Sequence, residues 1–159
     1  MKQHHVFSFL QRMGKSFMLP IAVLPVAGIF LGVGSSLTNE TTIAALHLES
    51  VLGQGTFLYS VLILLKQVGK VLFDNLPLIF AVSIALGMSK RRKEVAALAA
   101  IIAFFVMHAT INTLLCLDGS IVNGVVSNYI LDGSITSVCG MLSLEMGVFG
   151  GIIVGLGVS

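Results

Sequence analysis

Long apolar stretches separated by short polar segments make up most of the chain. A transmembrane helix needs about 20 mostly apolar residues to cross a hydrocarbon core of roughly 30 Å, because it rises about 1.5 Å per residue. This criterion predicts spans at residues 17–37, 75–89 and 95–115, and a fourth that begins near Leu142 in "LSLEMGVFGGIIVGLGVS". The pattern therefore predicts an all-α membrane bundle of about four spans.

The apolar region 56–88 is too long for one straight crossing. Two lysines and Asp74 interrupt it, and Pro77 is expected to break or kink a helix there. We divide the region into an amphipathic helix at about 56–72 and the separate span at 75–89. The pattern does not decide whether the amphipathic helix lies on the membrane or crosses it.

The first apolar stretch, 17–37, follows a basic segment and could be mistaken for a secretory signal. A signal core is only about 7 to 15 residues long and ends at a small-residue cleavage site, so a retained span is predicted. Pro20 and Pro25 lie in its first half, where a membrane helix tolerates proline if neighbouring helices cover the freed carbonyls.

Composition supports the membrane assignment. Of the 159 residues, 56% are hydrophobic and 10% are charged, whereas soluble domains have roughly 25% charged residues. A formal charge of +2 is too small to suggest nucleic-acid binding. Cys116 and Cys139 have no metal-binding or redox spacing; inert packed thiols are expected, with a disulfide as the alternative if both face an oxidising compartment.

The distribution of lysine and arginine predicts orientation. Basic residues precede the first span and form the run "KRRK" at 90–93, whereas segments 37–55 and 116–141 contain none. Cytoplasmic loops collect Lys and Arg, so the N-terminus and residues 89–94 are predicted to be cytoplasmic and the two charge-poor loops external.

Gly14-Lys15-Ser16 is the tail of a phosphate-binding loop if it is taken alone. The loop pattern G-x-x-x-x-G-K-S/T requires a glycine where this chain has Phe9, and it requires a preceding strand where the apolar residues recur at helical spacing. No nucleotide site is predicted.

Several polar side chains fall within apolar sequence. Asp74 and Asn75 adjoin a proline and are predicted to cap the next helix, although an intramembrane ionisable group is also a functional-site candidate. His108 and Asn112 lie one turn apart; hydrogen bonding between helices is favoured over a polar path. Glu145 is expected at the outer interface rather than paired inside the fourth span.

Two G-x-x-x-G motifs occur, at Gly28–Gly32 and Gly151–Gly155. Each places two glycines on one helix face and lets another backbone approach closely, either within the bundle or across a dimer.

The "KRRK" run is interpreted first as a topology-setting cytoplasmic loop. Binding of anionic lipid headgroups or docking of a soluble partner are the alternatives. Adjacent His4 and His5 do not share a face, so no metal site is expected there.

Three blocks of sequence carry a family resemblance. They are "GKSFMLPIAVLPVAGIFLGVGSSL" (14–37), "FDNLPLIFAVSIALGMSKRRKEVAALAAIIAFFVM" (73–107) and "GMLSLEMGVFGGIIVGLGV" (140–158). In order and spacing they resemble the N-terminal part of enzyme IIC, the membrane-embedded sugar-transporting subunit of the bacterial phosphoenolpyruvate-dependent phosphotransferase system. The resemblance is to its glucose, maltose and alpha-glucoside branch. Lys15 would then lie at the membrane interface, where the N-terminal helix leads into the first span.

The resemblance implies a larger helical domain in which an N-terminal scaffold set makes the homodimer contact and a C-terminal set holds the sugar. It implies alternating access coupled to phosphorylation, with EIIB and EIIA phosphocarrier domains as partners, in the bacterial cytoplasmic membrane. Residues 1–159 would be a truncated EIIC domain without EIIB or EIIA, inactive alone.

No functional residue is carried over from the family. The family's sugar-contacting histidine and glutamate and its phosphorylated cysteine belong to regions outside these blocks, and neither Cys116 nor Cys139 matches that cysteine. We assign no catalytic, substrate-binding, cofactor or metal residue, and the sugar is left open.

Two other classes of function remain. A small helical membrane protein with a structural or regulatory role would have the same composition. A small oligomeric channel would need more polar positions at pore-lining spacing than this sequence contains.

Overall fold

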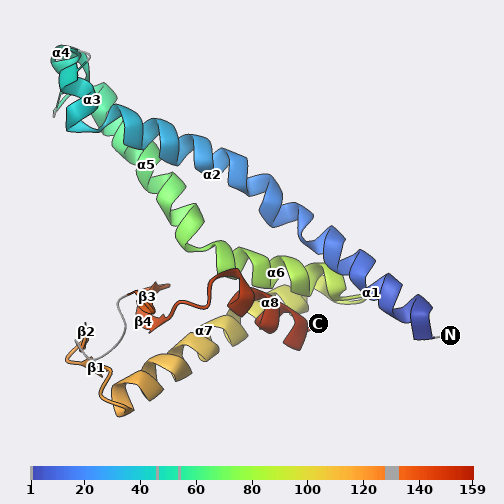
Figure 1. Ribbon diagram of the computed structural model, residues 1–159. Coiled ribbons are helices and arrows are strands. Elements are labelled where there is room, and N and C mark those ends of the chain that lie inside the picture. The colour runs from blue at the N-terminus through green and yellow to red at the C-terminus, as the bar shows by residue number, and fades with distance from the viewer. Residues whose placement is uncertain (1, 46, 54, 128–132) are drawn as a thin grey trace. The chain divides into compact units, whose positions relative to one another are not determined.

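Helices account for most of the chain in the computed structural model, which describes residues 2–45, 47–53, 55–127 and 133–159 (Figure 1). The side chains of residues 2–5, 49 and 50 lie outside the described part, and with them the expectation for His4 and His5. The helices are α1 Lys2–Ser16, α2 Met18–Leu37, α3 Glu40–Ala45, α4 Glu49–Leu52, α5 Phe57–Asp74, α6 Leu76–Met88, α7 Lys93–Leu117 and α8 Gly147–Gly157. The strands are β1 Ile121–Val122, β2 Val125–Val126, β3 Ile135–Val138 and β4 Met141–Leu144.

Two described stretches, Val6–Leu37 and Lys93–Leu117, are long and apolar enough to cross a membrane. The broken pair Phe57–Asp74 and Leu76–Met88 adds a third crossing if its members form one span, and α8 is a shorter apolar helix. Large apolar side chains on these helices are exposed, as expected of surfaces that face lipid. The predicted all-α membrane class is confirmed.

The chain divides into two units, which are described separately. Unit 1 comprises Met1–Pro20 and Asn75–Ser159, and unit 2 comprises Ile21–Asp74.

In unit 1, helix α6 is the central element, with α1, α7 and α8 packed against it (Figure 1). Its sequence "LPLIFAVSIALGM" is apolar on every side, which is the pattern of a surrounded helix. Ala81, Ile84 and Ala85 are fully buried on it. Small side chains on α6 and α7 allow the two helices to approach closely, around a core that includes Phe104 of α7.

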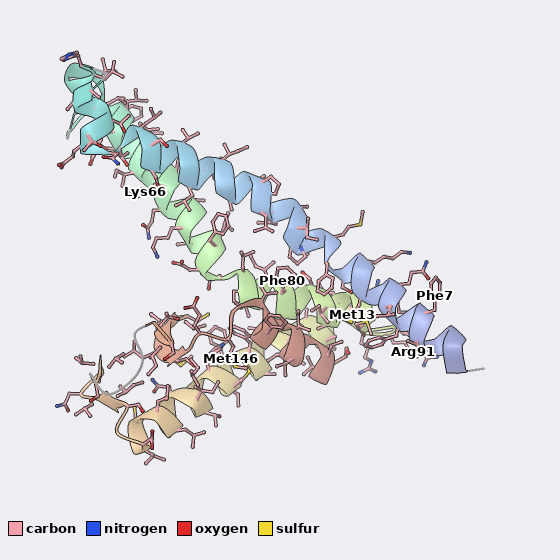
Figure 2. The ribbon with its side chains drawn as sticks, viewed as in Figure 1. Phe7, Met13, Lys66, Phe80, Arg91 and Met146 are labelled. Atoms are coloured by element: carbon pink, nitrogen blue, oxygen red, sulfur yellow. The ribbon has the colours of Figure 1, made fainter. Side chains whose placement is uncertain are left out.

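Helix α1 meets α6 through small residues at its end. The Ser16 side chain lies against Gly87, where an added Cβ would overlap the serine oxygen, and Ser16 Oγ donates to Arg12 O at 2.8 Å. The rings of Phe17 and Phe80 pack with their centroids 5.7 Å apart; Figure 2 shows Phe80 on α6. Ser16 of the Gly-Lys-Ser motif is therefore a buried packing residue.

In unit 2, helices α2 and α5 approach at two glycines. A Cβ added to Gly69 would lie 2.5 Å from Leu31 N, and one added to Gly34 would lie 2.6 Å from Lys66 Cβ. A cluster of Ile43, Leu52 and Leu62 joins α5 to α3 and α4, the short helices between α2 and α5.

Helix α5, Phe57–Asp74, begins and ends within two residues of the predicted bounds 56–72.

Two β-hairpins replace the loop expected at 116–141. In the first, Asn123 and Gly124 connect β1 to β2, with φ of 53° and 76°; in the second, Cys139 and Gly140 connect β3 to β4, with φ of 49° and 84°. Positive φ at both central residues is the requirement of a type I′ turn, which matches the twist of paired strands.

The second hairpin corrects the predicted start of the fourth span. Residues 141–144 form β4, paired antiparallel with β3, and the helix begins only at Gly147. Tight pairing across the Cys139-Gly140 turn satisfies the backbone of this apolar segment, so it does not need a helix to do so.

Candidate functional site

Two polar residues of α7 hold the β3–β4 hairpin. His108 Nδ1 lies 2.8 Å from Ser143 Oγ of β4, and Asn112 Nδ2 donates to the backbone oxygen of Leu142 at 2.6 Å. These residues were predicted to bond between helices; the structure shows that their partner is a strand instead. We call the four residues His108, Asn112, Leu142 and Ser143 the hairpin clamp.

The His108–Ser143 pair resembles a base and a nucleophile but is closed to substrate. His108 is 2% exposed and Ser143 is 0% exposed. The imidazole also packs edge-on against Phe104, with ring centroids 4.5 Å apart. A buried hydrogen bond of this kind fixes geometry, and without access for a substrate it cannot act in catalysis.

A third polar contact links the hairpin turn to the start of α6. Cys139 Sγ donates to Asn75 Oδ1 at 3.5 Å, within the range for sulfur. Burial raises the pKa of the Cys139 thiol, which keeps it protonated and able to donate at neutral pH. Cys139 and Cys116 are both free in the structure; Cys139 is half-buried, as expected of a packed thiol, whereas Cys116 is exposed, so the packed-thiol prediction is wrong at that position.

The prediction that Asn75 caps α6 is right about its position, but wrong about its side chain, which was expected to accept a hydrogen bond from the first turn. Asn75 is the N-cap of α6, and Pro77 occupies its first turn, as predicted. The Asn75 side chain makes no capping hydrogen bond, and its Oδ1 accepts from Cys139 Sγ. Asp74 ends α5 and pairs with Lys70 at 2.5 Å.

The Lys70–Asp74 pair gives a test of the environment of α5. The two side chains are 58% and 50% exposed, and lysine precedes aspartate, which is the weaker i,i+4 order. If the pair faces water or headgroups, Lys70→Met will lower the free energy of unfolding by less than about 0.5 kcal/mol. Unfolding of the full chain in mixed micelles measures this, with Gln67→Met as the matched control. A loss of several kcal/mol would instead place Asp74 in hydrocarbon.

Glycines on α8 form a close seam with α6. An added Cβ on Gly151 would overlap Pro77 O, and one on Gly155 would lie 2.7 Å from Ala81 O. The second G-x-x-x-G motif therefore packs within unit 1. Within unit 2, an added Cβ on Gly28 or Gly32 would meet no described heavy atom within 4 Å, so the first motif makes no such seam there.

The remaining candidates lie on the surface of the described chain. Glu145 is exposed and precedes α8 rather than entering it, and its backbone N–H donates to Ser134 O at 3.0 Å. The "KRRK" run is exposed and joins α6 to α7. Among the described residues, no group of three or more His, Cys, Asp or Glu side chains could hold a metal.

Sequence reasoning missed Ser143 and the hairpin that carries it. Asn123-Gly124 flanked by valines is the strongest short-range hairpin signal, and it was available in the sequence. The second turn has cysteine where asparagine is usual, and its strands are apolar enough to merge with the following helix. Among the described residues, these contacts position α7, the β3–β4 hairpin and the start of α6.

The chain is similar to known proteins of one family. The family model described as "Phosphotransferase system, EIIC" matches residues 14–159. A relative from Staphylococcus saprophyticus, described as "PTS system glucose-specific EIICBA component", is 38% identical over 150 residues. The matched region covers 94% of this chain and 20% of the relative, so the chain spans about a fifth of the relative's length.

Proposed function

Because this chain belongs to the glucose branch of the phosphotransferase system EIIC family, we propose that it forms part of a permease that couples sugar uptake to sugar phosphorylation. The observation that carries the proposal is the continuous family match over residues 14–159, which includes all of unit 2 and all of unit 1 after residue 13. The chain is an integral membrane protein, as its family and its apolar helices show.

The proposed substrate is a sugar of the glucose or alpha-glucoside type. Support comes from the relative, whose description is glucose-specific. We assign no residue of this chain to sugar binding or to phosphoryl transfer. The buried clamp and the α6–α8 seam instead favour a scaffold role for this part of an EIIC domain, with residues 1–159 as its N-terminal portion.

The proposed setting is the bacterial cytoplasmic membrane with the N-terminus inside. The support is the charge distribution: the basic N-terminal segment and the exposed α6–α7 loop flank apolar helices, and the hairpin region has no Lys or Arg. The proposed partners are EIIB and EIIA phosphocarrier domains and a second copy of the chain. The relative is itself described as an EIICBA component.

Sugar uptake with phosphorylation of the product tests this function. Cells without their own glucose permease would express this chain alone, or with a second chain that carries the remainder of the related permease. We expect glucose uptake and phosphorylated glucose only in the combined case. Uptake by the chain alone would contradict the proposed scaffold role.

Co-purification of the two chains separates the remaining outcomes. A stable complex that takes up no sugar would contradict a transport role. It would favour the alternative of a structural or regulatory partner, which has the same helical composition but requires no sugar path.

A further inference from the structure

Packing in unit 1 brings together two basic segments that are far apart in the sequence. Ser16 lies against Gly87 where α1 meets α6. Lys15 adjoins this contact on α1, and Lys90 lies three residues after Gly87, in the loop that follows α6. The six basic residues at this end of unit 1 are Arg12, Lys15, Lys90, Arg91, Arg92 and Lys93.

These six side chains form no salt bridge among the described residues. Arg12 is half-buried and the other five are exposed. Ser89 Oγ donates to Arg91 O, and Arg92 adopts a left-handed conformation with φ of 48°, so the loop is tightly turned at the start of α7. Glu94 is the nearest carboxylate in sequence, and the cluster therefore has a strong net positive charge.

An exposed apolar surface lies beside this charge. On α1, Val6, Phe7 and Leu10 are 60%, 69% and 58% exposed, whereas Ser16 is buried. Figure 2 shows Phe7, Met13 and Arg91 at the same end of unit 1. Apolar side chains next to basic ones are typical of helices that lie at the membrane interface, where the apolar face enters the acyl boundary and the cations reach the headgroups.

We propose that α1 and the α6–α7 loop together form one binding surface for the phosphate group of an anionic phospholipid. Charge complementarity selects the lipid, and the exposed apolar face of α1 selects a membrane-bound phosphate over a soluble one. The surface would tie the cytoplasmic end of α1 to that of α6 through a shared headgroup. The inference does not depend on sugar transport.

The test measures lipid preference in nanodiscs that contain the full chain, with spin-labelled phosphatidylglycerol and phosphatidylcholine as probes. Arg12→Gln/Lys15→Gln and Arg91→Gln/Arg92→Gln should each lower the relative association constant for phosphatidylglycerol about fivefold, which corresponds to about 1 kcal/mol. The control Lys66→Gln/Lys70→Gln in unit 2 removes the same charge and should change this association constant by less than about twofold.

Combining the two pairs distinguishes one surface from two. A shared headgroup is lost when either segment is neutralised, so the four-residue variant should lose little more than either pair alone. The proposal would be overturned if the fold-losses in the association constant from the two pairs multiply in the four-residue variant. It would also be overturned if Arg12→Gln/Lys15→Gln has no effect. The charge-keeping swap Arg12→Lys/Lys15→Arg should retain the preference; its loss would mean that the α1 pair acts through folding rather than charge.

Inorganic phosphate separates the two sources of the anion. If millimolar phosphate displaces labelled phosphatidylglycerol more than sodium chloride does at equal ionic strength, the surface is a soluble-phosphate site and the lipid assignment fails. Equal displacement by the two salts supports the lipid.

Discussion

Gly151→Ala will strongly destabilise unit 1, because the new Cβ would overlap the carbonyl oxygen of Pro77 and lie 2.9 Å from its carbon. These are backbone atoms of α6, so no side-chain rotation relieves the clash. Overpacking of a buried site costs about 1 to 3 kcal/mol, and this rigid case should lie at or above 3 kcal/mol. Titration of the full chain with SDS in mixed micelles, followed by far-ultraviolet circular dichroism, measures the loss.

Gly157→Ala is the matched control for this substitution. Gly157 ends the same helix, and an added Cβ there meets nothing within 4 Å among the described residues. Its free energy of unfolding should change by less than about 0.5 kcal/mol. If both variants unfold like the parent, α8 does not pack on α6 through this face, and the seam inferred from the glycine spacing is wrong.

The sequence predicted the long helices because membrane thickness sets their length. The predicted spans 17–37 and 95–115 became Met18–Leu37 and Lys93–Leu117. An uninterrupted apolar segment of about 20 residues in a membrane almost always forms a helix, because a helix satisfies each backbone polar group within its own segment. The break between α5 and α6 at Asn75 could also be predicted, because a proline in the first turn marks the start of a helix.

The contacts of these elements were less predictable. The motif Gly151–Gly155 indicated a close helix contact, but nothing in the spacing identifies α6 as its partner. His108 and Ser143 are 35 residues apart, and their pairing depends on a hairpin whose turn contains an unusual cysteine. The juxtaposition of the two basic segments likewise follows from the Ser16–Gly87 contact and not from the order of charges along the chain.

His108→Ala will release the β3–β4 hairpin from α7. The substitution leaves Ser143 Oγ, which is fully buried, without its partner and removes the ring that packs on Phe104. An unsatisfied buried hydroxyl costs about 1 to 3 kcal/mol, and the cavity adds to it, so a total loss of about 3 kcal/mol is expected. Hydrogen–deuterium exchange should show faster exchange at the amides of residues 135–144, with those of β1 and β2 unchanged.

A double-mutant cycle with Ser143→Ala isolates the hydrogen bond from the cavity. The double variant should be more stable than the sum of the single losses predicts, by about 1 kcal/mol, because the orphaned hydroxyl is removed together with its partner. Thr113→Ala is the control on the same helix: its exposed hydroxyl bonds only its own helix, at Ala109 O, and its loss should leave the hairpin protected.

His108→Asn completes the series, since an amide can place a polar atom near the position of Nδ1 and should restore part of the protection. Recovery with asparagine but not with alanine would show that the hydrogen bond to Ser143 holds the hairpin. If both variants keep full protection, the hairpin is held by the contacts of Asn112 with Leu142 and of Cys139 with Asn75 instead. In either case α7 and the N-cap of α6 both contact the β3–β4 hairpin, α7 through Leu142 and Ser143 of β4 and α6 through Cys139 of the turn.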